Sequence, residues 1–174
     1  MRKPLLTSLA VLTLLLSACG ASNEPAASDV QPAAETEASG ATVEQFASLI
    51  SEERRPVDEW LEDWDDNTCS TLSVADGDPL CEASLISGGF VANTAQIVME
   101  GATKEGAAAY IGLPPDEIEG IWQETYDAAT AASEAGEAIP DDCSTADDCV
   151  GKVMDFTMAM DDLQSKYDAW APYI

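Results

Sequence analysis

Apolar residues recur at helical spacing in four stretches after residue 41, and no stretch alternates convincingly between apolar and polar residues. The first stretch opens with Thr42 and Gln45, which fit a capping box at a helix N-terminus. Pro56 lies within this stretch and lacks a backbone N–H, so we expect a kink or split near Arg55. The apolar positions of the stretch are Phe46, Leu49, Ile50, Val57, Trp60, Leu61 and Trp64.

The second stretch begins at Asp78-Pro79, a combination typical of an N-cap followed by proline at the first helical position. Its period continues to about Thr103, through Leu85/Ile86, Phe90, Thr94 and Ile97/Val98. Gly88-Gly89 lies inside the stretch, and each glycine costs a helix about 1 kcal/mol relative to alanine. The pair therefore indicates either a break in the helix or the close approach of another helix.

The third stretch follows Pro114-Pro115, and its acidic start suits the positive end of a helix dipole. That first turn is expected to hold Asp116, Glu117 and Glu119, and the buried face Ile118, Ile121, Trp122, Thr125, Ala128 and Ala129. Residues 69–77 are expected to form a loop, and residues 104–112 a short additional helix.

The fourth stretch has the most regular stripe, after a cap expected at residues 144–147. Its apolar positions are Val150, Val153, Thr157, Met160, Leu163, Tyr167 and Trp170. Four helices with short connections predict an all-α fold, an antiparallel bundle of about four helices. The alanines of the third helix would let a neighbouring helix come close.

The start of the chain has a different pattern, in which basic residues precede a short apolar run that ends at a cysteine. Leu16-Ser17-Ala18-Cys19 resembles the lipobox of bacterial lipoproteins. The resemblance covers only the first 20 residues or so. It implies that a diacylglycerol is attached to the sulfur of Cys19 and that the chain is cut just before it.

A membrane-spanning helix fits this start less well than a lipid anchor does. From Leu5 to Ala18 there are 14 residues. Such a helix is about 21 Å long at ~1.5 Å per residue, too short for a hydrocarbon core about 30 Å thick. An ordinary secretory signal remains an alternative, because small residues precede those cleavage sites too. Two acyl chains give a stable anchor, so we expect the protein on the extracytoplasmic face of a cell membrane.

Composition divides the rest of the chain in two. Residues 21–41 are rich in Ala, Ser, Glu, Pro and Thr and contain no aromatic residue, a composition that cannot offset chain entropy by burial. We therefore expect a signal peptide at 1–18, a lipidated cysteine with a flexible linker at 19–41, and a helical domain at 42–174.

The mature chain is strongly acidic. All 33 acidic residues follow Cys19, against five basic ones, which gives a net charge of −28. This sign excludes binding to nucleic acid phosphates and disfavours docking on anionic headgroups. Solubility is the ordinary role of such a charge. The alternative interpretation is that the negative charge has a binding function and attracts cations or a basic partner.

Four cysteines remain after Cys19, and an even number in an exported domain predicts two disulfides. Short loops close readily, so we expect Cys69 to pair with Cys81 and Cys143 with Cys149. Their spacings of twelve and six residues do not fit a four-cysteine zinc site.

The chain has no histidine, which removes the commonest general base and histidine-dependent nucleophiles and metal sites. Carboxylate pairs could still serve a cell-wall hydrolase, and Glu124, beside Trp122 and Tyr126, is the least arbitrary candidate. A solvated helix face is the simpler interpretation of this glutamate. No catalytic residue is therefore assigned.

Oxygen-rich clusters beside the cysteines could bind calcium weakly. Residues 63–67 match the first ligand positions of an EF-hand loop, but Thr68 and Val74 stand where glycine and glutamate are needed. Residues 76–78, 141–142 and 147–148 are looser clusters. Because Asp and Asn also serve as cap and turn residues, no metal ligand or cofactor is assigned.

The larger apolar side chains have two possible roles as well. Trp60, Trp64, Trp122 and Trp170 could line a cleft, but packing in the core is the simpler expectation. Met154, Met158 and Met160 could form a site for a soft metal, but filling gaps in the core is the simpler expectation.

These patterns together predict a lipid-anchored, acidic helical module that binds an unidentified protein or ligand at the cell envelope and catalyses no reaction. A calcium-binding module and a carboxylate-dependent hydrolase are the alternatives.

Overall fold

Helices are the only regular elements in residues 40–140, 142–143 and 145–174, which the computed structural model describes. The expected all-α fold is confirmed for this part of the chain. The elements are α1 (Val43–Asp66), α2 (Thr71–Ala75), α3 (Pro79–Thr103), α4 (Glu119–Glu137) and α5 (Cys149–Asp168).

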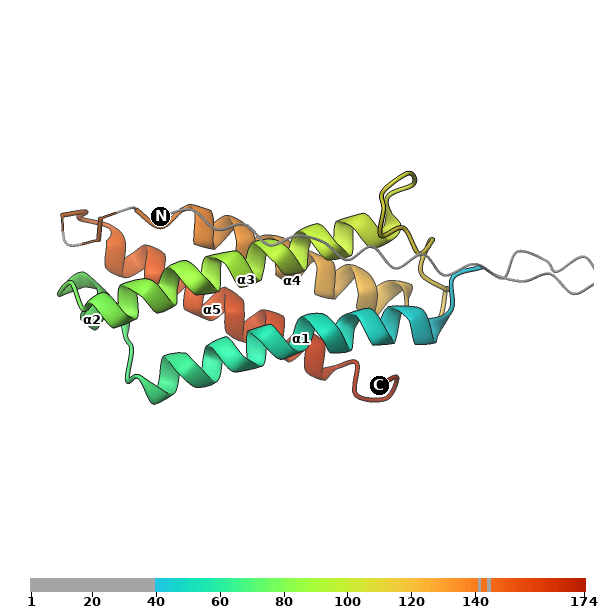
Figure 1. Ribbon diagram of the computed structural model, residues 1–174, viewed down its shortest axis with the longest axis horizontal. Coiled ribbons are helices and arrows are strands. Elements are labelled where there is room, and N and C mark those ends of the chain that lie inside the picture. Colours follow the sequence, from blue (N-terminus) through green and yellow to red (C-terminus); the bar gives the residue numbers. More distant parts are fainter. Residues whose placement is uncertain (1–39, 141, 144) are drawn as a thin grey trace, which may run out of the picture. The chain divides into compact units, whose positions relative to one another are not determined.

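The four long helices form an antiparallel bundle in which successive helices run in opposite directions (Figure 1). Helices α1 and α4 each pack against α3 and α5, which closes the bundle, and the short α2 packs against α3 and α5 at one end. The described residues make one compact unit. The predicted bundle is therefore confirmed, with α2 as an addition.

Two helices begin where the sequence predicts. Thr42 and Gln45 form the capping box of α1, in which the Gln45 side chain accepts from the Thr42 N–H at 2.9 Å. Asp78 caps α3, because its Oδ1 accepts from the backbone N–H groups of Leu80 and Cys81 at 2.9 and 3.2 Å. These bonds satisfy N–H groups that a helix start leaves without intrahelical partners.

Helix α1 continues through Pro56, so the expected split near Arg55 is wrong. A proline inside a helix costs about 3 kcal/mol through its missing N–H and its ring. Buried residues lie on both sides of Pro56, from Phe46 and Ile50 to Val57 and beyond. Burying them on one continuous face offsets that cost, at roughly 1.5–3 kcal/mol per large side chain.

The connections differ from expectation in two places. The segment expected to be a loop contains α2, whose start is capped by Ser70 and Ser73. Residues 104–112 form turns instead of a helix, and the N–H groups of Ile111 and Gly112 donate to the Ala102 carbonyl. This segment therefore folds back onto the end of α3.

Helices α4 and α5 begin later than predicted. Asp116 and Glu117 precede α4, so Glu119 is the acidic residue of its first turn. Helix α5 begins at Cys149 with Asp148 at its N-cap, and that cap makes no side-chain hydrogen bond. Ser144, at the start of the expected cap, lies outside the described residues.

The stripe predicted along the last helix is largely the buried face of α5. Val153, Met160, Leu163, Tyr167 and Trp170 are buried as expected. The prediction fails at two of its positions, because Val150 is exposed and Thr157 is only half-buried. Phe156, the residue before Thr157, is buried instead.

Small residues bring α3 close to its neighbours. A Cβ on Gly88 would lie 2.5 Å from Trp60 Cε2 of α1. One on Gly136 of α4 would lie 3.2 Å from Phe156 and 3.3 Å from the Cα of Gly89. The sequence left open whether the glycine pair breaks α3 or lets another helix come close. Helix α3 is continuous, and the close approach of other helices is confirmed.

Candidate functional site

Helix α3 carries two apolar stripes one residue out of phase, and the bundle buries only one of them. The buried stripe consists of Cys81, Leu85, Gly88, Ala92, Ala95, Met99 and Ala102. The second stripe contains Ile86, Phe90 and Ile97, which are 64%, 71% and 58% exposed. Half-buried Asn93 lies between them, so their steps of four, three and four place these residues on one helix face.

We call Ile86, Phe90, Asn93 and Ile97 the α3 stripe. The sequence pattern places Phe90 and both members of the pairs Leu85/Ile86 and Ile97/Val98 in one apolar period. The structure shows two stripes, of which only one is buried. The signal that distinguishes them is side-chain size, since the stripe with glycine and alanine lets two helices come close. The bulky side chains of the other stripe then remain on the surface.

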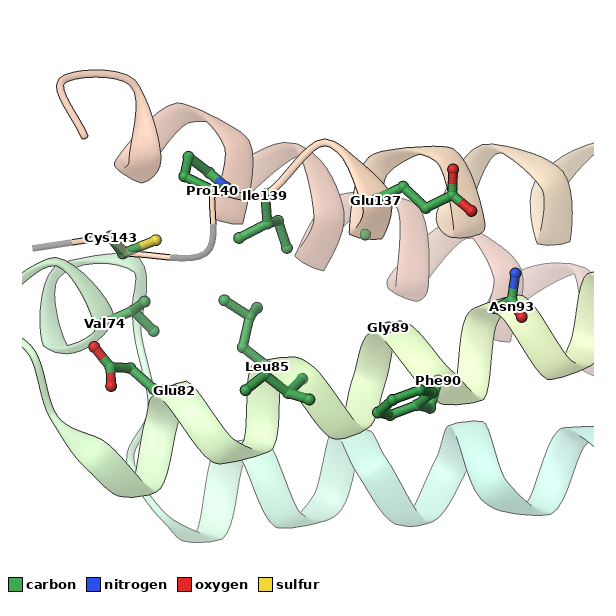
Figure 2. A pocket seen from close by; sticks show the side chains of 12 residues that line it. Val74, Glu82, Leu85, Gly89, Phe90, Asn93, Glu137, Ile139, Pro140 and Cys143 are labelled. Carbon is green, nitrogen blue, oxygen red and sulfur yellow. The ribbon is translucent and has the colours of Figure 1, made fainter. Parts of the chain in front are cut away.

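A pocket of about 460 Å³ lies on one side of the α3 stripe, between α3 and the segment that follows α4. Figure 2 shows Ile139 and Pro140 across the gap from Leu85 and Phe90. Most of its lining is apolar, and Asn93 supplies an amide. Apolar walls with a few polar groups are typical of ligand and peptide sites.

A second hollow of about 430 Å³ lies on the other side, between α1 and α3. Pro56 of α1 and Val91 of α3 are among the residues that line it. Ile86 and Phe90 line both hollows, so these two side chains form a ridge between them.

Three carboxylates line the hollows, and we call them the groove glutamates: Glu53, Glu82 and Glu137. They come from α1, α3 and the last residue of α4. Burial, and then the charge of Glu52, raises the pKa of Glu53. Among the described residues, no ion pair involves a groove glutamate, and no lysine or arginine lines either hollow.

Four of the five basic residues of the domain are in ion pairs elsewhere, and the fifth, Lys152, is on α5 and lines neither hollow. Arg54 pairs with Asp58 at 3.0 Å and with Asp168 at 2.6 Å. Three further ion pairs join Arg55 to Glu59, Lys104 to Glu100 and Lys166 to Glu124. Cations of the domain itself therefore do not neutralise the groove glutamates.

Both predicted disulfides are present. Cys69–Cys81 joins the segment after α1 to the first turn of α3, with the two Cα atoms 5.4 Å apart. Cys143–Cys149 closes the segment before α5, with a Cα separation of 5.2 Å. Cys143 also lines the larger pocket, so this disulfide holds one edge of the pocket to α5.

The four tryptophans are buried in the core, as expected. Trp60 and Trp64 also line a hollow of about 440 Å³ between α1 and α5, most of whose lining is polar. Trp122 packs edge-on against Phe46 and Trp170, with ring centroids 4.7 and 6.3 Å apart. Trp60 packs against Trp64 and Phe156, at 5.4 Å in each case.

The methionines of α5 follow the prediction only in part. Met160 is fully buried and fills the core, whereas Met154 and Met158 are 50% and 62% exposed. For those two the expected role as core gap-fillers is wrong, because neither is on the buried face of α5, which Val153, Phe156 and Met160 form in this part of the helix.

The carboxylate proposed as a catalytic candidate is on the surface. Glu124 accepts a hydrogen bond from Lys166 Nζ at 3.1 Å, and its side chain is 67% exposed. This is the solvated helix face that the sequence suggested as the simpler interpretation.

Three of the four clusters considered for calcium lie at helix ends, with Asn67, Asp76, Asp78 and Asp148 at cap positions. Asp63 belongs to α1, and Asn67 ends that helix with its side-chain amide bonded to the Asp63 carbonyl at 2.7 Å. Asp141 lies outside the described residues. Within the described ranges, no group of three or more cysteine or acidic side chains is placed to hold a metal ion.

The lipobox and Cys19 lie outside the described residues. Across residues 40–140, 142–143 and 145–174, none of the helices has the length and apolar character needed to cross a membrane. No protein-family model matches the chain, and neither a curated protein nor a solved structure is detectably similar to it.

Proposed function

We propose that the chain is a lipid-anchored module on the extracytoplasmic face of a cell membrane, and that it binds an envelope partner through the α3 stripe and the hollows beside it. The observation that carries this proposal is the exposure of Ile86, Phe90 and Ile97 on one helix face. Covering a large apolar side chain releases roughly 1.5–3 kcal/mol. A ridge of three such residues beside apolar hollows is a surface that gains from being covered.

The N-terminal features support the location in this proposal. The lipobox-like sequence ending at Cys19 implies two acyl chains, which give a stable anchor. A linker of the composition of residues 21–41 has a root-mean-square span of roughly 25 Å as a random coil. Such a tether lets the helical domain meet a partner beyond the lipid headgroups.

The chemistry of the hollows supports binding over catalysis. Their polar side chains are the groove glutamates, Asn93, Ser87 and Thr94. The sequence contains no histidine that could act with them as a general base. We therefore assign the surface to recognition, and no catalytic residue to the protein.

Photo-crosslinking in intact cells tests the binding surface. A benzophenone amino acid replaces Phe90 in one variant and Met158 in a second, since both side chains are exposed but only Phe90 belongs to the α3 stripe. We expect one defined adduct from position 90, lost when Ile86→Asp is added, and none from position 158. Equal adducts from both positions, or none from position 90, would contradict the proposal.

The anchor is tested separately. Cys19→Ser removes the sulfur that carries the lipid, so the variant should leave the membrane fraction while the wild-type chain stays with it. Intact-mass measurement of the membrane-extracted protein should find the chain beginning at residue 19 with a diacylglycerol attached. A bare thiol with residues 1–18 still present would rule out the anchor.

A further inference from the structure

The charge around the α3 stripe indicates which class of partner covers it. The groove glutamates come from three different helices and lie beside the ridge of Ile86 and Phe90. We propose that the occupant is a basic amphipathic helix of a partner protein, whose apolar face packs on the α3 stripe and whose lysines or arginines meet the groove glutamates. This inference rests on the proposed function and adds the chemistry of the partner.

The shape of the surface suits a helix. The α3 stripe runs from Ile86 to Ile97, about 16 Å at ~1.5 Å per residue. Its spacing of four, three and four residues is that of one face in a two-helix contact. Ile86 and Phe90 project between two hollows of about 460 and 430 Å³, which can receive apolar side chains from a helix laid alongside.

The charges select a basic helix over an acidic or neutral one. Four of the five basic residues in the described part of the chain are already in ion pairs. The fifth, Lys152, is on α5 and lines neither hollow. Covering the α3 stripe with an apolar or acidic surface would remove water from the groove glutamates without supplying a positive charge to pair with them.

A second copy of this chain is disfavoured for the same reason. Packing one α3 stripe on another would bring two sets of groove glutamates together. Residues 42–174 hold 29 acidic and five basic residues, so each copy carries a net charge of −24 in this domain. Like charges facing each other across an interface oppose association.

Two synthetic helical peptides test the inference. Each is about 18 residues long, roughly 27 Å as a helix, with leucine at the positions that would face the α3 stripe. One has lysine on both flanks of the leucines and the other has glutamate. The protein is residues 19–174 with Cys19→Ser, which retains the whole compact unit formed by the described residues.

Calorimetric titration at low salt should show the lysine peptide binding at least tenfold more tightly than the glutamate peptide. Its affinity should fall as salt is added, because salt screens exposed charge pairs. The Glu53 carboxyl provides a second readout, since a bound cation should lower the raised pKa of Glu53 in a carbon-detected NMR titration.

Matched variants test whether the peptide binds at the α3 stripe and the hollows beside it. Phe90→Asp should weaken the lysine peptide at least tenfold, whereas Met158→Asp, an equivalent change on exposed α5, should not. Ile86→Asp provides a second stripe variant, and circular dichroism confirms that each variant remains helical. Glutamine at all three groove glutamates should weaken binding and flatten its salt dependence. The control carries the same charge change at exposed residues elsewhere: Glu105→Gln, Glu117→Gln and Glu119→Gln.

Several results would overturn the inference. Equal affinity for the two peptides would show that charge does not select the partner, and equal losses in Phe90→Asp and Met158→Asp would place the binding elsewhere. A dimer in sedimentation that Phe90→Asp dissociates would make a second copy the occupant. Failure of both peptides, together with a defined adduct from position 90 in cells, would refute the basic helix while leaving the proposed function intact.

Discussion

The contact between Gly88 and Trp60 sets the distance between α1 and α3, and a single methyl group tests it. A Cβ at position 88 would lie 2.5 Å from Cε2 and 2.7 Å from Nε1 of Trp60. The Trp60 Nε1–H donates to the Ser84 carbonyl at 2.7 Å, and Trp64 and Phe156 pack against the ring. The indole therefore cannot move aside without losing this hydrogen bond or disturbing its neighbours.

The expected magnitude follows from three contributions. Replacing glycine by alanine inside a helix gains about 1 kcal/mol of stability. Forcing an extra methyl group into a packed core costs about 1–3 kcal/mol. Leaving a buried indole N–H without its acceptor costs about 1–3 kcal/mol more. Gly88→Ala should therefore lower the free energy of unfolding by about 1–5 kcal/mol.

Gly89→Ala is the matched control, because a Cβ at position 89 meets no atom within 4 Å. It gains the same helix propensity without the clash, so the two variants should differ by about 2–6 kcal/mol in the free energy of unfolding. Urea denaturation followed by tryptophan fluorescence measures both values. If Gly88→Ala were as stable as Gly89→Ala, the close contact of α1 with α3 would be wrong.

Three further predictions concern the core, the groove and a disulfide. Thr125→Val leaves the buried Trp170 Nε1–H, now bonded to Thr125 Oγ1 at 2.9 Å, without an acceptor and should cost about 1–3 kcal/mol in chemical denaturation. Burial, and then a neighbouring carboxylate, raises the pKa of Glu53. The free energy of unfolding should therefore fall as pH rises from the ordinary glutamate pKa near 4.5 through the raised pKa of Glu53. Glu53→Gln should flatten that part of the stability–pH curve in thermal unfolding. Replacing Cys69 and Cys81, which are 12 positions apart, by alanine removes the loop that their disulfide closes and should lower the free energy of unfolding by about 3 kcal/mol in urea.

The helical bundle could be predicted because local signals agree with the tertiary packing. The capping box at Thr42 and the Asp78-Pro79 start depend on residues that are close in sequence, and both are present. The disulfides follow from short spacing. Pro56 shows the limit of such signals, because the buried residues on both sides of it hold α1 together across the proline.

The candidate site depends on which of two stripes faces the core, and periodicity alone cannot decide that. Ile86 and Phe90 have the hydrophobicity of core residues, and their spacing fits a helix as well as that of Leu85 and Ala92 does. The neighbouring helices make the choice, since Trp60 of α1 can approach α3 this closely only at a residue without a side chain, which is Gly88 of the buried stripe. Helix contacts of this kind involve residues far apart in sequence.

The most direct measurement of the central claim is carbene or hydroxyl-radical footprinting of the purified protein and of intact cells. Phe90 and Met158 are both exposed in the isolated domain, so both should be labelled strongly in the purified protein. We predict that Phe90 becomes protected in cells, where a partner covers the α3 stripe, while Met158 is labelled equally in both samples. Equal labelling of Phe90 in cells and in the purified protein would contradict the claim that this surface is a binding site.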